Sequence, residues 1–462
     1  NAQRDHRVKL PVYPRTKPSG VEWLGDVPDH WSVKAIKWET PVLRGASPRP
    51  IDDPTYFDDD DGEYSWVRIS DVTSAGTYLS ATEQKLSRLG SSLGVKLKPG
   101  ALFLSIAGSV GKPCITQIKC CIHDGFVYFP RFKGDAKFLY YLFASGEPYR
   151  GLGKLGTQLN LNTDTVGSIV AGFPNPAEQR AIAAFLDRET GRVDRLVAKK
   201  RELIERLKEK RTALISRTVT RGLPPAAARA AGLPENPLLK PSGLDWLGDI
   251  PEHWEVMRLK RFFKHVYRYP TYYDIQYVDE GVPEIRGEAL VDGKIVELED
   301  QRFISPETNS RFPQTIVDVG DIVMSVRGTM GKIGVVGTNF KGANITANLL
   351  RLSPDERQAV PEFLSWLFRS GFFLQALDRV CPQTTIQTVT MPQLAAIELP
   401  HPPLPEQAAI AAYLDLETAK LDALVGKVEE AVERLQEYRA ALITAAVTGK
   451  IDVRSAALTA RQ

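Results

Sequence analysis

The chain has 462 residues, with 59 Lys and Arg against 56 Asp and Glu, and its formal net charge is only +3 at pH 7. A chain of this length is too long for one hydrophobic core, so we expect two or three domains. The near-balance of charge neither indicates nor excludes a nucleic-acid ligand, because such binding needs basic patches rather than a basic total.

The cysteines and the hydropathy indicate a cytoplasmic protein. No apolar run is long enough to cross a membrane, and we find no signal peptide. No pair of cysteines has the Cys-x-x-Cys spacing, and the adjacent Cys120 and Cys121 are a poor frame for zinc or a disulfide. We therefore expect free, buried thiols in a reducing cytosol and no metal site.

The chain repeats itself. Residues 17–31 and 240–254 are identical at eleven of fifteen positions, and both contain Trp-Leu-Gly-Asp-x-Pro-x-His-Trp. A second match, Glu-Gln-x-Ala-Ile-Ala-Ala, begins at Glu178 and again at Glu406. The sequence between these matches has diverged. This pattern predicts two copies of a constant frame, each carrying a variable module.

The first module, residues 17–175, contains two candidate ligand-binding elements. Arg68 follows the apolar pair Trp66-Val67, and an arginine at this place can read guanine, clamp a phosphate or pair with a carboxylate. A hydrophobic strand then runs into Ser105-x-x-Gly-x-x-Gly-Lys112. Glycines let a backbone approach phosphate, and lysine neutralises it, but the same residues also suit a tight turn between strands. The motif is not a P-loop, because Ile106 stands where a glycine is required.

Residues 151–156 match Gly-x-Gly-x-x-Gly, but they follow no strong strand and have no counterpart in the second half. A dinucleotide site is therefore not expected. A basic loop in which Arg150 and Lys154 reach phosphate fits these residues better.

A long helix is predicted over residues 176–222. Asn175 serves as the N-cap, Pro176 occupies the first turn, Glu178 closes a capping box and Gly222 is the C-cap. Residues 404–450 repeat this helix. Apolar residues spaced by three and four form a coiled-coil seam along both, and each helix is about 60 Å long. One repeated Trp from each frame suits a core or a docking surface. With the leucines of the seam, these form the predicted seam and partner-docking set: Trp31, Trp254, Leu186, Leu196, Leu203, Leu207, Leu414, Leu424, Leu435 and Leu442.

A Pro- and Ala-rich linker, residues 223–239, leads to the second module, residues 240–403. A module is only about 40 Å across, so parallel helices would need a return of about 60 Å that it cannot span. We therefore expect antiparallel helices with the modules at opposite ends, related by an approximate two-fold axis. Residues 451–462 form a tail.

The second module repeats the candidate elements as Arg286 and as Ser325-x-Arg327-Gly-x-x-Gly-Lys332. The cluster Tyr267–Tyr273 adds Arg268 among aromatic residues, which suits base contact or packing under a loop. The complete predicted DNA-binding set is Arg68, Ser105, Lys112, Arg150, Lys154, Arg268, Arg286, Ser325, Arg327 and Lys332.

No catalytic constellation is recognisable, since His-Glu-x-x-His, Gly-x-Ser-x-Gly and P-loop motifs are all missing from the sequence. A nuclease or methyltransferase fused into this chain would need such motifs. A scaffold built on the coiled coil, without a DNA role, is the remaining alternative. Salt-dependent, sequence-selective binding to duplex DNA would exclude it.

Over nearly its whole length the chain resembles the specificity subunit of type I restriction–modification enzymes. The resemblance rests on the opening of both halves, on the strand that enters the glycine turn, and on a Pro-rich segment with Glu-Gln before each long helix. The second half has the fuller Pro-x-x-Glu-Gln pattern, Pro402-Pro-Leu-Pro-Glu406, and the first half departs from it with Pro174-Asn-Pro-Ala-Glu178. It implies an α+β protein with two mixed target-recognition domains, separated by two antiparallel helices in a coiled coil with a pseudo-two-fold repeat. The family favours Arg in the glycine turn, and the first half departs from this with Ala107.

The resemblance also implies what the chain does. Each recognition domain reads one part of a bipartite, asymmetric DNA site, and the helices set the spacing. The chain itself performs no chemistry and holds no cofactor. Two methyltransferase subunits use S-adenosylmethionine to methylate adenine, and motor-nuclease subunits use ATP and Mg for cleavage. The sequence does not reveal which bases are read.

Overall fold

The protein is described by a computed structural model that covers residues 10–150, 152, 161–268, 275–327, 329–381 and 389–454. The chain forms two compact units: unit 1 comprises residues 1–200 and 430–462, and unit 2 comprises residues 201–429. The two long helices, α6 (Pro176–Arg221) and α12 (Leu404–Val447), are each shared between the units. None of the helices in the described ranges is long and apolar enough to span a membrane.

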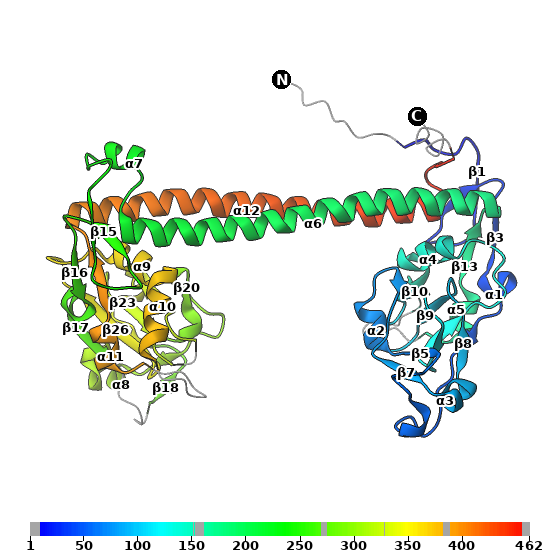
Figure 1. The fold of residues 1–462 in the computed structure, drawn as a ribbon, viewed down its shortest axis with the longest axis horizontal. Coiled ribbons are helices and arrows are strands. Elements are labelled where there is room, and N and C mark those ends of the chain that lie inside the picture. Colours follow the sequence, from blue (N-terminus) through cyan, green and yellow to red (C-terminus); the bar gives the residue numbers. More distant parts are fainter. Residues whose placement is uncertain are drawn as a thin grey trace. The chain divides into compact units, whose positions relative to one another are not determined.

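Unit 1 contains two mixed sheets, with strand orders β4-β12-β9-β10-β6 and β7-β5-β11-β8, and two small antiparallel pairs, β1-β2 and β3-β13 (Figure 1). The strands are β1 (Thr16–Pro18), β2 (Asp26–Pro28), β3 (Ser32–Ala35), β4 (Leu43–Arg44), β5 (Tyr64–Val67), β6 (Tyr78–Leu79), β7 (Gln84–Leu86), β8 (Val95–Leu97), β9 (Leu102–Ser105), β10 (Pro113–Thr116), β11 (Cys120–Ile122), β12 (Phe126–Tyr128) and β13 (Val170–Phe173). The shorter helices are α1 (Ile36–Glu39), α2 (Ile69–Ser74), α3 (Arg88–Leu93), α4 (Ala136–Ala144) and α5 (Thr163–Ser168).

Unit 2 repeats this plan with sheets in the orders β17-β26-β23-β24-β21-β20 and β18-β22-β19-β25, and pairs β14-β15 and β16-β27. Its strands are β14 (Leu239–Pro241), β15 (Asp249–Pro251), β16 (Glu255–Arg258), β17 (Phe263–Arg268), β18 (Tyr277–Val278), β19 (Val282–Ile285), β20 (Leu290–Val291), β21 (Gly293–Ile295), β22 (Phe303–Ile304), β23 (Ile322–Ser325), β24 (Ile333–Val335), β25 (Asn344–Ile345), β26 (Leu349–Pro354) and β27 (Glu398–His401). The shorter helices are α7 (Pro225–Ala230), α8 (Pro306–Arg311), α9 (Pro361–Arg369), α10 (Gly371–Val380) and α11 (Met391–Ala396).

The repeat therefore extends into the segments whose sequences have diverged. The central strands β9 and β23 are buried along their whole length, which explains their uninterrupted apolar sequences. Ser105 pairs with Phe126 in unit 1, and Ser325 pairs with Leu349 at the same place in unit 2. The predicted α+β class with two mixed-sheet domains and two long helices is confirmed.

The core of each unit joins its sheet domain to the beginning of one long helix and the end of the other. In unit 1, Trp31 shares a core with Ile182 near the start of α6 and Val447 at the end of α12. An ion pair of 2.9 Å joins Asp194 to Arg439 in the same unit. Rising residue numbers on one helix thus meet falling numbers on the other, so the helical segments within each unit are antiparallel, as expected.

The ends of the helices show one confirmed signal and one error. The Asn175 side chain accepts a hydrogen bond from the backbone N–H of Glu178 at 3.0 Å, so the predicted N-cap is confirmed. Gly222 and Gly449 have positive φ after the last turns, as C-caps do. The Glu178 carboxylate, however, closes no capping box, because it accepts its hydrogen bonds from Tyr13, His30 and Trp31 instead.

At two positions on α6 the buried seam is displaced by one residue from the predicted one. Val197 and Ile204 are buried, whereas the adjacent Leu196 and Leu203 are 41% and 42% exposed. One residue along a helix turns a side chain by about 100°, so these two leucines lie on the flank of the seam. Of the other predicted positions, four are buried (Leu186, Leu207, Leu414 and Leu442), Leu435 is half-buried and Leu424 is exposed.

Candidate nucleic-acid interface

The two glycine turns are held by their serines. In unit 1, the Ser105 hydroxyl donates to the carbonyl of Ala107 at 2.7 Å, and in unit 2 the Ser325 hydroxyl donates to the carbonyl of Thr329 at 2.6 Å. Ser105 has no exposed surface, which corrects its placement among the DNA contacts: it stabilises the turn from inside. A Cβ on Gly111, whose φ is +82°, would lie 2.9 Å from the Tyr149 ring, so packing requires this glycine.

The lysines that end the two turns have different surroundings. The Lys112 ammonium donates to the carbonyls of Thr73 and Ala75, both at 2.8 Å, at the C-terminal end of α2. Free carbonyls and the helix dipole favour a cation there. Lys332 is exposed, and no ion pair or side-chain hydrogen bond is found for it among the described residues. Only the second lysine is therefore free to meet a ligand.

Unit 2 has a cationic cleft of about 510 Å³ beside its glycine turn. Four cations and one carboxylate line it, together with neutral donors and acceptors. The lining residues are Arg286, Gly287, Glu288, Arg302, Ser325, Arg327, Thr329, Lys332, Thr346, Asn348 and Leu349. The structure thus brings together four residues of the predicted DNA-binding set: Arg286, which directly follows β19, and Ser325, Arg327 and Lys332 of the glycine turn that follows β23.

Arg286 is held in place within this cleft. Its guanidinium contacts the Asp300 carboxylate at 2.6 Å, and only 14% of its side chain is exposed. That contact lowers the pKa of Asp300 and raises the pKa of Arg286, so both groups remain charged. The buried Nε of Arg286 has no hydrogen-bond partner among the described residues. Arg327 is exposed, and no ion pair is found for it in the described ranges.

Sequence reasoning missed Arg302 and Asn348. Asn348 directly precedes β26 and is exposed, and Arg302 directly precedes β22. Neither residue belongs to a repeated motif, so only the pairing of strands reveals that they share a cleft. The one signal available was Thr346 and Asn348, two polar residues between the short strand β25 and the apolar strand β26. An asparagine side chain can bond adenine through two atoms, and arginine can bond guanine in the same way.

The corresponding surface of unit 1 has the same backbone frame with other side chains. Arg68 follows β5 as Arg286 follows β19, and it is exposed. Ala107 stands in the place of Arg327. His123 precedes β12 where unit 2 has Thr346, and burial lowers the pKa of its imidazole. The two surfaces therefore offer different donors and acceptors on equivalent strands.

The remaining predicted DNA contacts fall into three groups. Arg150 is exposed and pairs with Glu147 at 2.8 Å. Arg268, on β17, is half-buried and donates to the carbonyl of Ala347 at 3.4 Å, next to the cleft. Lys154, the Gly-x-Gly-x-x-Gly run and the tyrosines of the predicted 267–273 cluster after Arg268 lie outside the described residues.

The repeated motifs form the two frames. The Trp31 indole donates to Glu178 at 3.1 Å and the Trp254 indole donates to Glu406 at 3.0 Å. Both indoles are completely buried. This corrects their expected share in partner docking, because a side chain without exposed surface cannot meet a partner. This explains part of the Glu-Gln motif at the start of each long helix, because its glutamate carboxylate accepts a hydrogen bond from the indole N–H.

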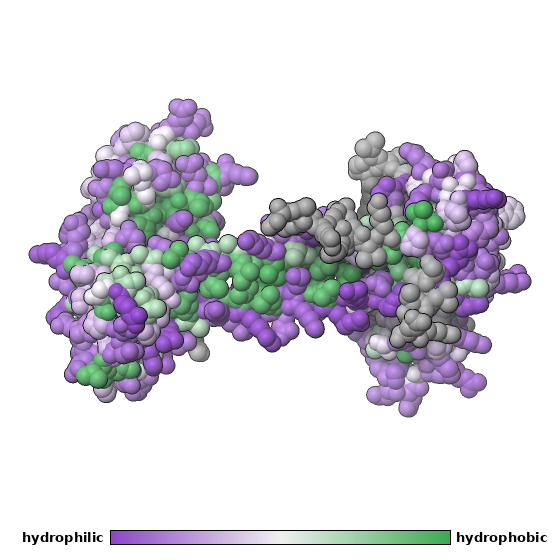
Figure 2. Space-filling model, turned by 90° about the horizontal axis from the view of Figure 1, so that it is seen from above, coloured by the Kyte–Doolittle hydropathy of each residue, from purple (hydrophilic) through white to green (hydrophobic). Residues whose placement is uncertain are grey.

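The glutamines of the same motif connect each long helix to its sheet domain. Gln179 accepts from the backbone N–H of Asp135, and Gln407 accepts from that of Val360, both at 2.9 Å. Apolar side chains remain exposed on the helices, including Leu196, Leu203 and Leu424, and Figure 2 shows apolar surface along the helical segments. No cluster of metal-binding side chains is found in the described ranges.

Comparison with known proteins gives consistent matches. Residues 52–206 and 251–434 match the family described as type I restriction modification DNA specificity domain. The chain is 26% identical over 300 residues to the type I restriction enzyme EcoBI specificity subunit of Escherichia coli, covering 64% of this chain and 61% of that protein. It is 25% identical over 221 residues to the MjaVIII specificity subunit of Methanocaldococcus jannaschii, covering 45% and 49%. The matches thus span about half to three fifths of these relatives.

Solved structures share the fold. A chain from a structure described as the basis of complex assembly and conformational transition of the type I R-M system has a TM-score of 0.69 at 18% identity, covering 92% of this chain and 99% of that one. The HsdS subunit from Thermoanaerobacter tengcongensis has a TM-score of 0.55 at 18% identity, covering 92% and 98%.

Proposed function

The chain belongs to the family of type I restriction–modification DNA specificity domains, and from this we propose that it is a non-catalytic subunit that reads a bipartite DNA site. Each sheet domain reads one part of the site. The subunit directs adenine methylation, and cleavage where motor-nuclease subunits are present, without performing either step.

The cationic cleft of unit 2 carries this proposal. Arg286, Arg302, Arg327 and Lys332 supply positive charge for the phosphate backbone. Asn348, Thr329 and Thr346 supply the neutral hydrogen-bonding groups that distinguish base edges. A purely structural scaffold has no need for an open cleft with four cations, of which only Arg286 has an ion pair among the described residues.

The differing surfaces of the two units support a site with two unlike parts. Equivalent backbone positions hold Ala107 in one unit and Arg327 in the other, and Lys112 is occupied by a helix end whereas Lys332 is free. A protein that read the same sequence twice would present the same groups twice. We therefore propose an asymmetric bipartite site.

The partners follow from the family. We propose two methyltransferase subunits that bind S-adenosylmethionine, and motor-nuclease subunits that bind ATP and Mg, in the cytoplasm. The exposed leucines beside the seam, Leu196, Leu203 and Leu424, supply apolar surface for docking. Native mass spectrometry is expected to give two methyltransferase subunits per chain, and saturation at one would contradict the duplicated frame.

Selection from randomised duplexes tests the reading function. The wild-type protein is expected to enrich a site in two parts. Arg327→Ala or Asn348→Ala is expected to relax one or two positions in one part only, at a cost of about 1–3 kcal/mol for each lost contact. Glu356→Ala, which removes an exposed carboxylate outside the cleft, is the matched control. If the wild-type protein selects no sequence and its duplex binding does not depend on salt, the scaffold alternative is correct.

We further propose that α6 and α12 set the gap between the two parts. The ion pairs Asp194–Arg439 and Arg211–Asp422 place Lys200 opposite Glu433. Inserting seven residues in each helix at these facing levels preserves the three-four seam. The insertion lengthens the pair by about 10 Å, and the preferred gap is expected to grow by up to about three base pairs at roughly 3.4 Å each. An unchanged gap at full affinity would mean that the helices do not set it.

A further inference from the structure

A second hollow, of about 280 Å³, adjoins the cationic cleft of unit 2, and Lys332 lines both of them. Two further cations line it, Arg211 from α6 and Arg369 from the end of α9, and its one carboxylate is Asp292. Leucine, isoleucine, methionine and glycine residues make the rest of the wall. The hollow thus places a long helix, a short helix and the glycine turn around one cationic space.

Arg211 and Arg369 lie near the same indole. The guanidinium carbon of Arg369 is 4.3 Å from the ring centre of Trp366, and that of Arg211 is 6.0 Å from it. The indole N–H donates to Asp415 at 2.9 Å, which fixes the ring. Gly293 leaves room for the first arginine, since a Cβ there would lie 3.0 Å from Nη1 of Arg369. Packing therefore holds two like charges close together.

The carboxylates near this pair neutralise it only in part. Asp292 contacts Arg369 at 3.5 Å, and 82% of the Asp292 side chain is exposed, so water weakens the contact. Asp422 lies 2.9 Å from Nε of Arg211, but this buried Nε has no hydrogen-bond partner in the described ranges. Burial, and after it the charge of Arg211, lowers the pKa of Arg369. An anion between the two guanidinium groups would relieve their repulsion.

Unit 1 lacks the second guanidinium. The counterpart of Trp366 is Tyr141, because each donates to an aspartate at the same place on its long helix. In this register Ala144, the last residue of α4, stands where Arg369 ends α9. The arginine of the long helix is kept as Arg439, in an ion pair of 2.9 Å. The paired guanidinium groups therefore belong to unit 2 alone.

We propose that Arg211 and Arg369 clamp one backbone phosphate of the DNA that occupies the cationic cleft, next to the phosphate that meets Lys332. This rests on the proposed reading of DNA by unit 2. Guanidinium groups bind phosphate through paired N–H donors. Because Lys332 belongs to both hollows, a DNA strand that meets it has its next phosphates within reach of this one.

The clamp positions DNA without reading it, because a phosphate contact carries no sequence information. Arg211 belongs to α6, so the contact ties the DNA to the long helix as well as to the sheet domain. Both arginines are thus positioning residues: they fix where the duplex lies against the helix that is proposed to set the gap.

Arg369→Met keeps the stem of the side chain and removes its charge. We expect the slope of log affinity against log salt to fall by about 0.9, the value for one phosphate, while selection from randomised duplexes returns the same bases. Because both arginines hold one phosphate, adding Arg211→Met should lower the slope no further. Arg369→Lys should keep the slope. The midpoint of urea unfolding should stay unchanged, since the ion pair lost is long and exposed.

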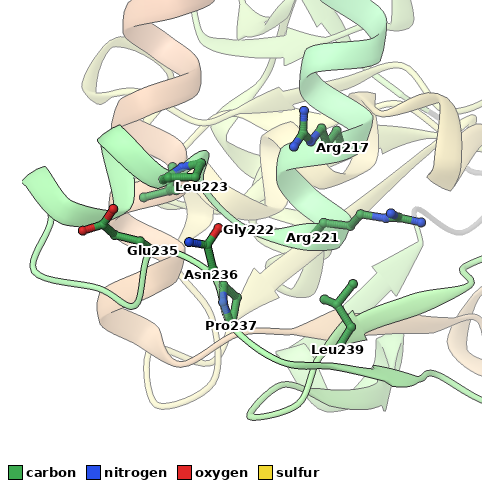
Figure 3. A pocket seen from close by; sticks show the side chains of 9 residues that line it. Arg217, Arg221, Gly222, Leu223, Glu235, Asn236, Pro237 and Leu239 are labelled. Carbon is green, nitrogen blue, oxygen red and sulfur yellow. The ribbon is translucent and has the colours of Figure 1, made fainter.

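Other arginines of the long helices serve as controls. Figure 3 shows Arg217 and Arg221 on the last turns of α6, where they line a separate hollow of unit 2. Both are exposed. Arg221→Met removes a charge from the same helix outside the clamp, and Arg439→Met removes the unit 1 counterpart of Arg211. Neither is expected to change the salt slope.

Duplexes that carry one neutral methylphosphonate at a time, through the part read by unit 2 and its flanks, locate the phosphate. The wild-type protein should lose about tenfold in affinity at the clamped position. Arg369→Met should lose nothing there, whereas Lys332→Met should remain sensitive.

Three results would overturn the clamp. If the wild-type protein selects a DNA site and Arg369→Met changes neither the slope nor the methylphosphonate profile, the clamp is wrong and the proposed function stands. If Arg369→Met weakens binding of the methyltransferase subunit at an unchanged slope, the hollow holds a carboxylate of that partner instead. If the wild-type protein selects no DNA site, the proposed function fails and the clamp fails with it.

Discussion

Lys112 and Lys332, which end the two glycine turns, can be substituted in parallel to separate a structural role from a DNA-binding role. They occupy equivalent positions in the repeat, yet Lys112 bonds the C-terminal end of α2 and Lys332 faces the cleft. Replacing each by Met keeps the length and apolar stem of the side chain and removes the charge. We expect Lys112→Met to lower local stability and Lys332→Met to lower DNA affinity.

The magnitude for Lys112 follows from its two hydrogen bonds of 2.8 Å to carbonyl groups. A hydrogen bond from a charged donor contributes about 1.5–3 kcal/mol, and because this ammonium is partly exposed we expect the lower value for the pair. That corresponds to roughly tenfold faster hydrogen exchange by the amides at the end of α2. Mass spectrometry of the peptide that contains residues 69–75 measures it directly.

The magnitude for Lys332 follows from counterion release. Losing one phosphate contact lowers the slope of log affinity against log salt by about 0.9. The advantage of the wild-type protein over Lys332→Met therefore shrinks about 3.5-fold as salt rises from about 50 to about 200 mM. If Lys112→Met changes the salt slope equally, or Lys332→Met accelerates exchange in its own turn without changing the slope, the distinction between the two lysines is wrong.

Further expectations concern the interior of the protein. Burial raises the pKa of the Cys114 thiol to about 12, so the thiolate is absent at pH 8. Iodoacetamide should therefore label the less buried Cys381 first, as detected by mass spectrometry. Labelling of Cys114 before Cys381 in the native protein would refute this. Leu207→Ala should lower the free energy of unfolding, measured with urea, by about 2–5 kcal/mol, and Leu203→Ala should lower it by much less. Equal losses would mean that Leu203 is buried in the seam as first predicted. Glu178→Gln removes a carboxylate with three donors and should lower the melting temperature by several degrees, and no change would contradict its role.

The architecture was predictable because the sequence repeats itself and its apolar residues recur at helical spacing. The duplicated segments 17–31 and 240–254 predicted two frames, and the three-four spacing of apolar residues predicted the long helices. Asn175 was predictable as a cap because capping is local in sequence. Two seam positions were wrong because Leu196 and Leu203 fit the spacing as well as Val197 and Ile204 do, and only packing against the other helix decides between adjacent residues.

The site was predictable only in part. Arg286, Arg327 and Lys332 were found because they stand in motifs that both halves share. Arg302 and Asn348 belong to no motif and reach the cleft through strand pairing. Ser105 was misplaced because a serine that closes a turn and a serine that binds phosphate occur in the same glycine-rich context.

The division between constant and variable positions has a physical basis. The shared residues of the repeat, such as Trp31 and Glu178, are buried and bonded to one another, so a change at one leaves an unpaired polar group in the core. The residues that differ between the halves, such as Ala107 and Arg327, stand on the solvent side of backbone turns that are already fixed by internal hydrogen bonds. Their side chains can therefore change without cost to the turn. A frame of this kind permits each sheet domain to acquire its own ligand specificity while the helices and their indole anchors stay the same.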